Sequence, residues 1–175
     1  MMGFMGKRHE ARERAVQFLF QHELNPPANL ELELAHFWSA QRMSALEDEK
    51  APSTWGPRDE TAPPTADEAE MRLFADPLIR GVLEQRDQID EHIKKHTKNW
   101  DFHRIAAVDR NIMRLAIYEM LNRDDIPPVV SINEAVDIAK KFSTQDSGKF
   151  VNGILDKVRG EVLRPSRGEG VKSGV

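Results

Sequence analysis

Apolar residues recur every three or four positions along most of the chain, which is the period of an amphipathic helix. This period predicts helices near residues 7–23, 28–46 and 68–97, a short turn near 102–106, and three more helices before Pro165. No segment alternates apolar and polar residues over more than a few positions, so no strand is expected. The pattern therefore predicts an all-α protein with about seven helices, arranged as two helical bundles packed together.

Local signals indicate where some of these helices bend or begin. Pro77 lies inside the third apolar segment and should kink that helix or mark its restart. Ser131 and Glu134 have the spacing of a capping box, which predicts that Ser131 begins the sixth helix. Asp146 or Ser147 is expected to cap the seventh helix, because short oxygen-bearing side chains accept hydrogen bonds from free helix amides.

An acidic, proline-rich insert (residues 47–70) interrupts the helical pattern. Residues 51–66 carry four prolines and no apolar period, which predicts a loop or disordered segment. The insert holds eight acids and two bases, whereas the rest of the chain holds 21 acids and 23 bases and is mildly basic. The chain is interpreted as one domain, residues 1–175, with helical halves at 7–98 and 99–165 and a flexible tail at 166–175.

The composition excludes several classes of chemistry. The sequence contains no cysteine, so a disulfide framework, a cysteine-ligated metal and a thiol nucleophile are excluded. No apolar run approaches the roughly 20 residues that a membrane-spanning helix needs. These features fit a protein of the reducing cytoplasm, and a cytoplasmic location is expected.

Two apparent metal or catalytic motifs are also set aside. His92 and His96 stand four residues apart, but lysines lie beside them and would repel a cation, so a solvated face is expected. Gly148 and Lys149 resemble the end of a phosphate-binding loop, but position 143 is Ser and Phe150 follows the lysine. No catalytic residue, metal or cofactor is therefore expected, and the chain is not interpreted as an enzyme.

The first predicted helix begins with an unusual concentration of bases. Lys7, Arg8, Arg12, Arg14 and His9 crowd its first two turns. A helix N-terminus carries partial positive charge, so bases are unfavourable there by a few tenths of a kcal/mol each. This arrangement suggests an anionic partner such as a phosphate backbone. The alternative, equally open on the sequence alone, is that neighbouring glutamates pair with these bases and nothing binds.

The start of the seventh predicted helix is the second candidate binding place. The free amides of a helix N-terminus can hold a phosphate, and Lys149 adds a positive charge. Phe150 offers a ring that could stack on a base. The alternative is a plain helix cap with Phe150 in the core, and the spacing alone favours this reading for Phe150.

Several runs in the last third of the chain resemble the C-terminal half of the NusB family of transcription antitermination factors. They are residues 114–120 (RLAIYEM), 125–127 (DIP), 132–140 (INEAVDIAK) and 146–156 (DSGKFVNGILD). Residues 12–20 (RERAVQFLF) and 78–82 (LIRGV) resemble the family's first and third helices. The acidic insert departs from the compact family pattern.

The resemblance implies a seven-helix fold of two packed three-helix subdomains, present as a monomer or a homodimer. It also implies binding to boxA RNA of ribosomal RNA leaders together with NusE, a ribosomal protein of the small subunit. The pair would then join the RNA polymerase antitermination complex and suppress termination. The basic patch and the seventh helix, chosen above from the residues alone, are the places where the resemblance puts the RNA.

Individual roles follow from the resemblance by position. RNA contacts are implied for Lys7, Arg8, Arg12, Phe20, Lys149 and Phe150, with Phe20 standing where the family often has Tyr. A surface shared by RNA and NusE is implied for Asp109, Tyr118, Glu119 and Asp146. Two alternatives remain: a helical protein–protein adaptor, and a NusB-like RNA-binding module linked to rRNA methylation, although this chain shows no catalytic methyltransferase domain.

Overall fold

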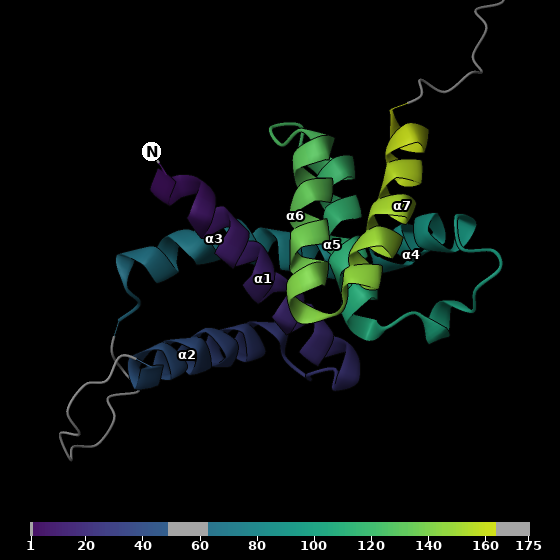
Figure 1. Ribbon diagram of the computed structural model, residues 1–175. Coiled ribbons are helices and arrows are strands. Elements are labelled where there is room, and N and C mark those ends of the chain that lie inside the picture. The colour runs from purple at the N-terminus through teal and green to yellow at the C-terminus, as the bar shows by residue number, and fades with distance from the viewer. Residues whose placement is uncertain (1, 49–62, 164–175) are drawn as a thin grey trace, which may run out of the picture. The chain divides into compact units, whose positions relative to one another are not determined.

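The described part of the protein is built from helices alone. The computed structural model describes residues 2–48 and 63–163, and in these ranges the chain forms seven α-helices, one short 3-10 helix and no strand. In chain order they are α1 (Met2–Leu24), α2 (Leu30–Asp48), α3 (Ala66–Glu84), α4 (Arg86–Lys95), η1 (Phe102–Arg104), α5 (Ala107–Asn122), α6 (Pro128–Phe142) and α7 (Gln145–Val162) (Figure 1). The all-α prediction is confirmed.

The chain divides into two compact units, Met1–Arg80 and Gly81–Val175. The sequence pattern placed the division near residue 98, so that α4 would belong with the N-terminal half. In the structure α4 packs against α5 and α7 and falls within the second unit. The apolar side chains Ile89 and Ile93 of α4 are fully buried there, which is why the helix belongs to that core.

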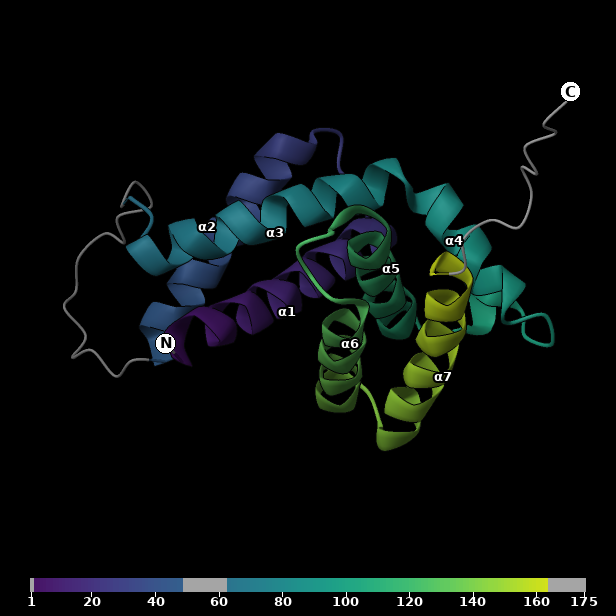
Figure 2. The same cartoon turned by 90° about the horizontal axis from the view of Figure 1, so that it is seen from above.

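The first unit is built from α1, α2 and most of α3 (Figure 2). Aromatic residues join the first two helices, because the rings of Phe18 and Phe37 meet edge-on with their centres 5.4 Å apart. Trp38 is 1% exposed, and its indole Nε1 donates a 2.8 Å hydrogen bond to the carboxylate of Asp76 on α3. This bond satisfies the one polar atom of a large buried ring and ties α2 to α3.

The second unit is a bundle in which α5, α6 and α7 pack against one another. Most residues of α5 are buried, which is typical of a central helix rather than a surface one. The apolar period of the sequence predicts one buried stripe on each of the other two helices. These stripes are largely buried, with Ile132, Ala135 and Ala139 on α6 and Val151, Ile154, Leu155 and Val158 on α7. Val136 and Phe142, which belong to the same period on α6, are partly or well exposed.

Pro77 does not break its helix where the sequence suggested. α3 runs from Ala66 to Glu84 through Pro77, and the restart comes eight residues later, at Gln85. Proline has no amide hydrogen to donate to the carbonyl of the preceding turn, but the next two residues, Leu78 and Ile79, are fully buried. The free energy of burying these side chains is larger than that of one lost hydrogen bond, so the helix continues.

Two predicted helix caps are wrong. α6 begins at Pro128, with Pro127 as its cap, and Ser131 lies inside the first turn with 1% exposure. Proline has its φ already set for a first helical position and lacks the amide that would be left free. For α7 the cap is Thr144, whose hydroxyl oxygen accepts from the Ser147 amide at 3.1 Å, so the helix begins before either predicted residue.

The acidic insert is shorter than predicted. Residues 47–48 end α2 and residues 66–70 begin α3, where the Thr65 hydroxyl accepts from the Glu68 amide at 3.1 Å. Glu68 is buried and accepts two hydrogen bonds from Arg42 of α2, at 2.6 and 2.7 Å. The charge of this glutamate is therefore matched by a base 26 residues away in the chain. The predicted disorder of residues 49–62 and of the tail falls outside the described residues.

Candidate nucleic-acid interface

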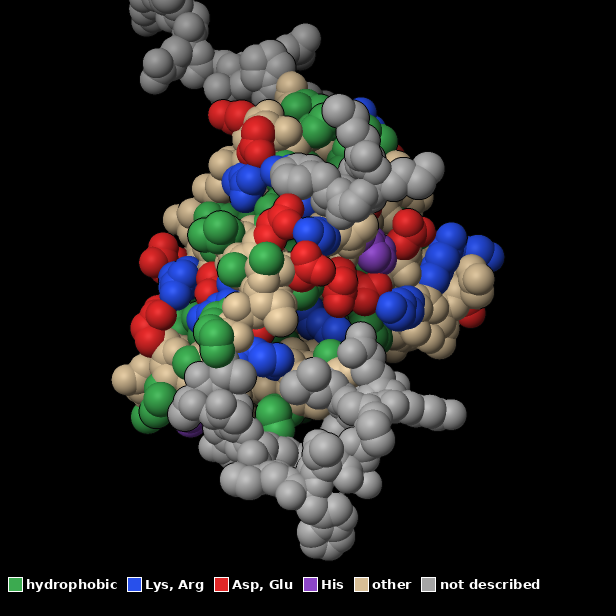
Figure 3. Space-filling view, turned by 90° about the vertical axis from the view of Figure 1, so that its left-hand side faces the viewer, with side chains coloured by type: hydrophobic (Ala, Val, Ile, Leu, Met, Phe, Trp, Pro, Cys, Tyr) green, Lys and Arg blue, Asp and Glu red, His purple; other side chains and the backbone are tan. Residues whose placement is uncertain are grey.

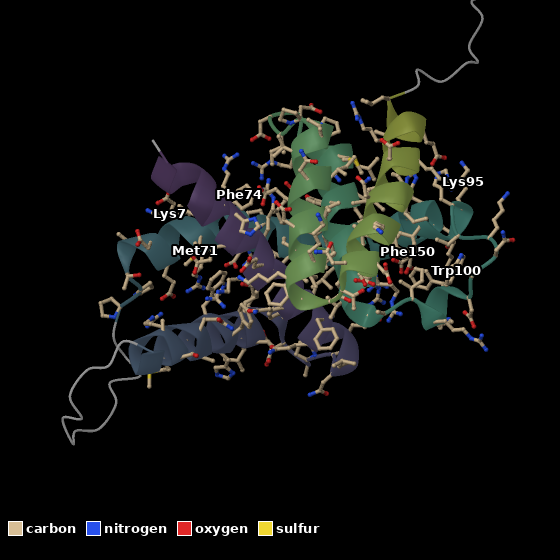
Figure 4. The ribbon with its side chains drawn as sticks, viewed as in Figure 1. Lys7, Met71, Phe74, Lys95, Trp100 and Phe150 are labelled. Atoms are coloured by element: carbon tan, nitrogen blue, oxygen red, sulfur yellow. The ribbon has the colours of Figure 1, made fainter. Side chains whose placement is uncertain are left out.

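The first base of the N-terminal helix is held by acids of α3. Lys7 Nζ lies 2.8 Å from Asp67 and 2.7 Å from Glu70 (Figure 4 labels Lys7). These two partners, Asp67 first, raise the pKa of Lys7 above its usual range. Lys7 therefore carries its charge at all physiological pH values, but that charge is already matched by two carboxylates. A phosphate would compete with them for Lys7.

Arg8 and Arg12 lie over the ring of Phe74, which α3 contributes. Their guanidinium carbons stand 4.9 and 5.0 Å from the ring centre, within the range of a cation–π interaction. Arg8 is half-buried, whereas Arg12 is only 3% exposed. The same spacing that put both bases on one helix face thus directs both toward one aromatic residue.

Glutamates of α1 form ion pairs with some of its basic side chains, as the alternative interpretation predicts. His9 Nε2 lies 2.9 Å from Glu13, and Arg14 lies 3.5 Å from Glu10, each pair one helical turn apart. Acidic and basic side chains are interleaved over the face seen in Figure 3. The remaining predicted contact of this helix, Phe20, is half-buried near its end.

At the start of α7 the structure leaves both predicted contact residues accessible. Lys149 is exposed, and Phe150 is half-buried rather than enclosed in the core. The Phe150 ring lies 5.9 Å from the ring of Trp100, tilted by 52° (Figure 4). Trp100 is 64% exposed. Trp100 is not among the contact residues predicted from the sequence, although a tryptophan in a polar loop beside Lys98 is a signal for such a role.

Asp109 connects the start of α5 to the start of α7. It is 5% exposed, and its Oδ2 accepts a 3.0 Å hydrogen bond from the hydroxyl of Ser147, 38 residues away. Its Oδ1 is buried without a hydrogen-bond partner among the described residues. Burial raises the pKa of Asp109, and the hydrogen bonds from Ser147 and Ser143 oppose that rise. Asp146, the other predicted member of this surface, is exposed.

The two predicted contact residues near the end of α5 have different environments. Glu119 is 1% exposed, so little of its side chain is offered to a partner. Tyr118 is half-buried and packs directly on Gly81, where an added Cβ would lie 2.1 Å from the ring carbon Cζ. Tyr118 therefore packs against α3 with one part of its ring, while another part stays accessible.

The two histidines expected on a solvated face instead meet one carboxylate. His92 Nδ1 and His96 Nε2 lie 3.6 and 3.0 Å from Glu161 of α7, and Lys95 also pairs with Glu161. Among the side chains that the structure describes, no group of three or more His, Asp or Glu is placed to hold a metal ion. Within residues 2–48 and 63–163 no helix combines the length and apolar character needed to cross a membrane.

Comparisons with known proteins agree with this arrangement. The pattern that defines the NusB family matches residues 9–159. The transcription antitermination protein NusB of Methylacidiphilum infernorum is 41% identical over 154 residues, covering 88% of this chain and 91% of that protein. Its counterpart of the same name in Bacillus subtilis is 41% identical over 156 residues, covering 89% and 97%.

Solved structures give the same result. A structure of T. maritima NusB superposes with a TM-score of 0.63 at 37% identity, covering 88% of this chain and 91% of that one. A structure of antitermination factors NusB and NusE in complex with dsRNA superposes with a TM-score of 0.62 at 23% identity, covering 90% and 98%, a likeness of fold alone. By family pattern, by sequence identity over most of its length and by fold, this chain belongs to the NusB family of transcription antitermination proteins.

Proposed function

We propose that this chain binds boxA RNA of ribosomal RNA leaders together with NusE, and that the complex joins elongating RNA polymerase in the cytoplasm and suppresses termination. In this role the chain is a binding adaptor and carries out no catalysis. The observation that supports the proposal most directly is the start of α7, where exposed Lys149 stands beside the half-exposed ring of Phe150. A cation and a ring next to each other suit a phosphate and its base.

Each group has a separate physical task in the proposed complex. Lys149 neutralises a phosphate and releases counterions, which gives affinity that falls steeply with salt. The ring of Phe150 stacks on an unpaired base and adds preference for single-stranded RNA. In α1, the half-buried Arg8 is better placed to reach a phosphate than Arg12, which is 3% exposed and packs on Phe74.

The Asp109 carboxylate is the feature of this surface that folding alone does not explain. A buried carboxylate oxygen without a partner is unfavourable by about 1–3 kcal/mol or more, and Oδ1 of Asp109 is such an atom. Because Asp109 is only 5% exposed, a donor from a partner, such as an amide of NusE or a ribose hydroxyl, would reach this atom only if the starts of α5 and α7 moved apart on binding. The complex would then be stabilised by a hydrogen bond that the free protein lacks, which fits the proposed joint surface.

The test is fluorescence anisotropy of a labelled boxA RNA titrated with this protein, with and without NusE, at two salt concentrations. We expect salt-sensitive binding that tightens when NusE is present. Lys149→Ala should weaken binding, whereas Arg86→Ala, which removes an equal charge from an exposed position on α4, should not. Absence of binding by the folded protein under every condition would contradict the proposal and favour a helical adaptor for proteins only.

A further inference from the structure

A shallow pocket lies between the end of α4 and the first half of α7, within the second unit. Its volume is about 320 Å³, and the residues that matter for the argument are Lys98, Trp100, Lys149, Phe150, Gly153 and Lys157. The rings of Trp100 and Phe150 stand 5.9 Å apart and are tilted, so together they form a broken apolar surface beside the opening. Figure 4 labels both residues. We call it the Trp100 pocket.

The exposure of Trp100 is not explained by folding. At 64% exposed, its indole leaves a large apolar area in water, whereas the buried Trp38 is 1% exposed and uses its indole Nε1 in a hydrogen bond. The part of the ring that does not contact Phe150 adds nothing to the stability of the free protein, and covering it would favour binding of a partner. Trp100 is therefore placed to contact a ligand rather than the core.

The loop that carries Trp100 is anchored on both sides. On the N-terminal side, the Trp100 amide donates to the Thr97 carbonyl at 2.9 Å, and the buried Thr97 hydroxyl donates to the Ile93 carbonyl at 2.8 Å. On the C-terminal side, the Phe102 ring lies 5.5 Å from the guanidinium carbon of Arg110 on α5. These contacts hold the backbone on each side of Trp100, so the loop does not need to be ordered anew when a ligand arrives.

Gly153 keeps the pocket open. It lies in the interior of α7, where glycine is one of the least favourable residues. A Cβ added at this position would meet no atom within 4 Å, so packing does not require a glycine. The space above it belongs to the pocket, and any side chain here would project into that space. Gly160, on the same helix, is equally unhindered but does not line the pocket.

We propose that the Trp100 pocket receives an unpaired base of RNA, which stacks on Trp100 and Phe150. This inference rests on the proposed RNA binding and adds a recognition residue to it. Three exposed lysines, Lys98, Lys149 and Lys157, surround the rings and supply the positive charge that the flanking phosphates need. Bases in a duplex are already stacked and cannot reach these rings, so the pocket selects single-stranded RNA.

The test compares three variants by anisotropy, using the boxA strand alone and the same strand annealed to its complement. Trp100→Ala and Gly153→Leu should each weaken single-strand binding about tenfold, the usual scale of one lost base–aromatic stack. The matched control Gly160→Leu should bind like the wild type. Affinity for the annealed duplex should be the same in all four proteins. Circular dichroism melts of each variant show whether it is folded.

A second readout follows the ring itself. Because Trp100 is exposed, its emission should fall when the single strand is added, and Trp100→Phe should abolish that part of the change while keeping most of the affinity. If Trp100→Ala and Gly153→Leu bind the single strand like the wild type while Lys149→Ala does not, RNA binding stands and the pocket hypothesis is wrong. If the wild type binds no RNA, both proposals are wrong. If Trp100→Ala and Gly153→Leu bind NusE more weakly than the wild type but bind RNA equally well, the pocket is a protein-binding surface instead.

Discussion

Gly81 of α3 and Tyr118 of α5 are in direct contact, with the tyrosine ring occupying the space in which a side chain at position 81 would begin. A Cβ at position 81 would lie 2.1 Å from Cζ and 2.2 Å from the hydroxyl oxygen of Tyr118. No pair of non-bonded atoms tolerates such distances, so either the ring or the helix would have to move. The last residues of α3, which belong to the second unit, can approach α5 this closely only because residue 81 has no side chain.

We expect Gly81→Ala to lower the free energy of unfolding by about 1–3 kcal/mol, the range for adding a methyl group to a packed site. Urea unfolding followed by circular dichroism measures it. The control is Gly160→Ala, where the added methyl meets open space, and which should be neutral or stabilising by up to about 1 kcal/mol. Tyr118→Leu in the Gly81→Ala background should restore part of the loss, and additive effects of the two changes would refute direct contact.

A buried ion pair joins α4 to α5. Arg114 Nε and Nη2 donate to Oδ1 and Oδ2 of Asp90 at 2.7 and 2.9 Å, and the two side chains are 6% and 11% exposed. Asp90→Ala should reduce the free energy of unfolding by about 3–5 kcal/mol, because it leaves a buried guanidinium without its carboxylate. Asp87→Ala, at an exposed position on the same helix, should change it by less than about 0.5 kcal/mol. Equal effects of the two changes, measured by chemical denaturation, would show that the pair contributes little.

Glu161 makes stability depend on pH in the acid range. Hydrogen bonds from Lys95 and then His96 lower the pKa of Glu161 to about 2. The folded state favours the ionised carboxylate more than the unfolded state does. The stability that Glu161 contributes to the fold is therefore complete above the ordinary pKa of 4.5 and is lost as pH falls toward 2. Glu161→Gln should therefore be less stable than the wild type at pH 6, and the gap should close by pH 2. A gap independent of pH in paired urea titrations would argue against the ion pairs as its cause.

Asp109 should have the opposite dependence on pH. Its pKa is raised by burial, so the folded state disfavours the carboxylate, and ionisation above the ordinary pKa of 3.8 destabilises the fold. Asp109→Asn should then be more stable than the wild type at pH 7, with an advantage that disappears as the pH is lowered below 3.8. The control is Asp137→Asn, at an exposed position on α6. Thermal melts at pH 7 and pH 3.5 compare these proteins, and a destabilised Asp109→Asn at pH 7 would contradict the expectation.

Much of this protein follows from local sequence. The apolar stripe of α7, from Val151 to Val158, is buried as its period predicted, because a helix that repeats apolar residues every three or four positions must bury that face. The missing period-two pattern likewise excluded strands from the described residues. Lys149 and Phe150, chosen from their place at a helix start, are accessible in the structure. Helix type and buried face depend on neighbours three and four residues away, which the sequence displays directly.

The other features depend on residues that are distant in the chain. Ser131 has the neighbours of a cap, yet the helix begins at Pro128 and buries that serine. The partner of Trp100 is 50 positions away, and those of Asp109 and Glu68 are 38 and 26 positions away. No spacing rule connects such positions, because their meeting is set by how whole helices pack. The sequence determined the helices and their apolar faces; the tertiary structure alone decided which charges are buried and which rings meet.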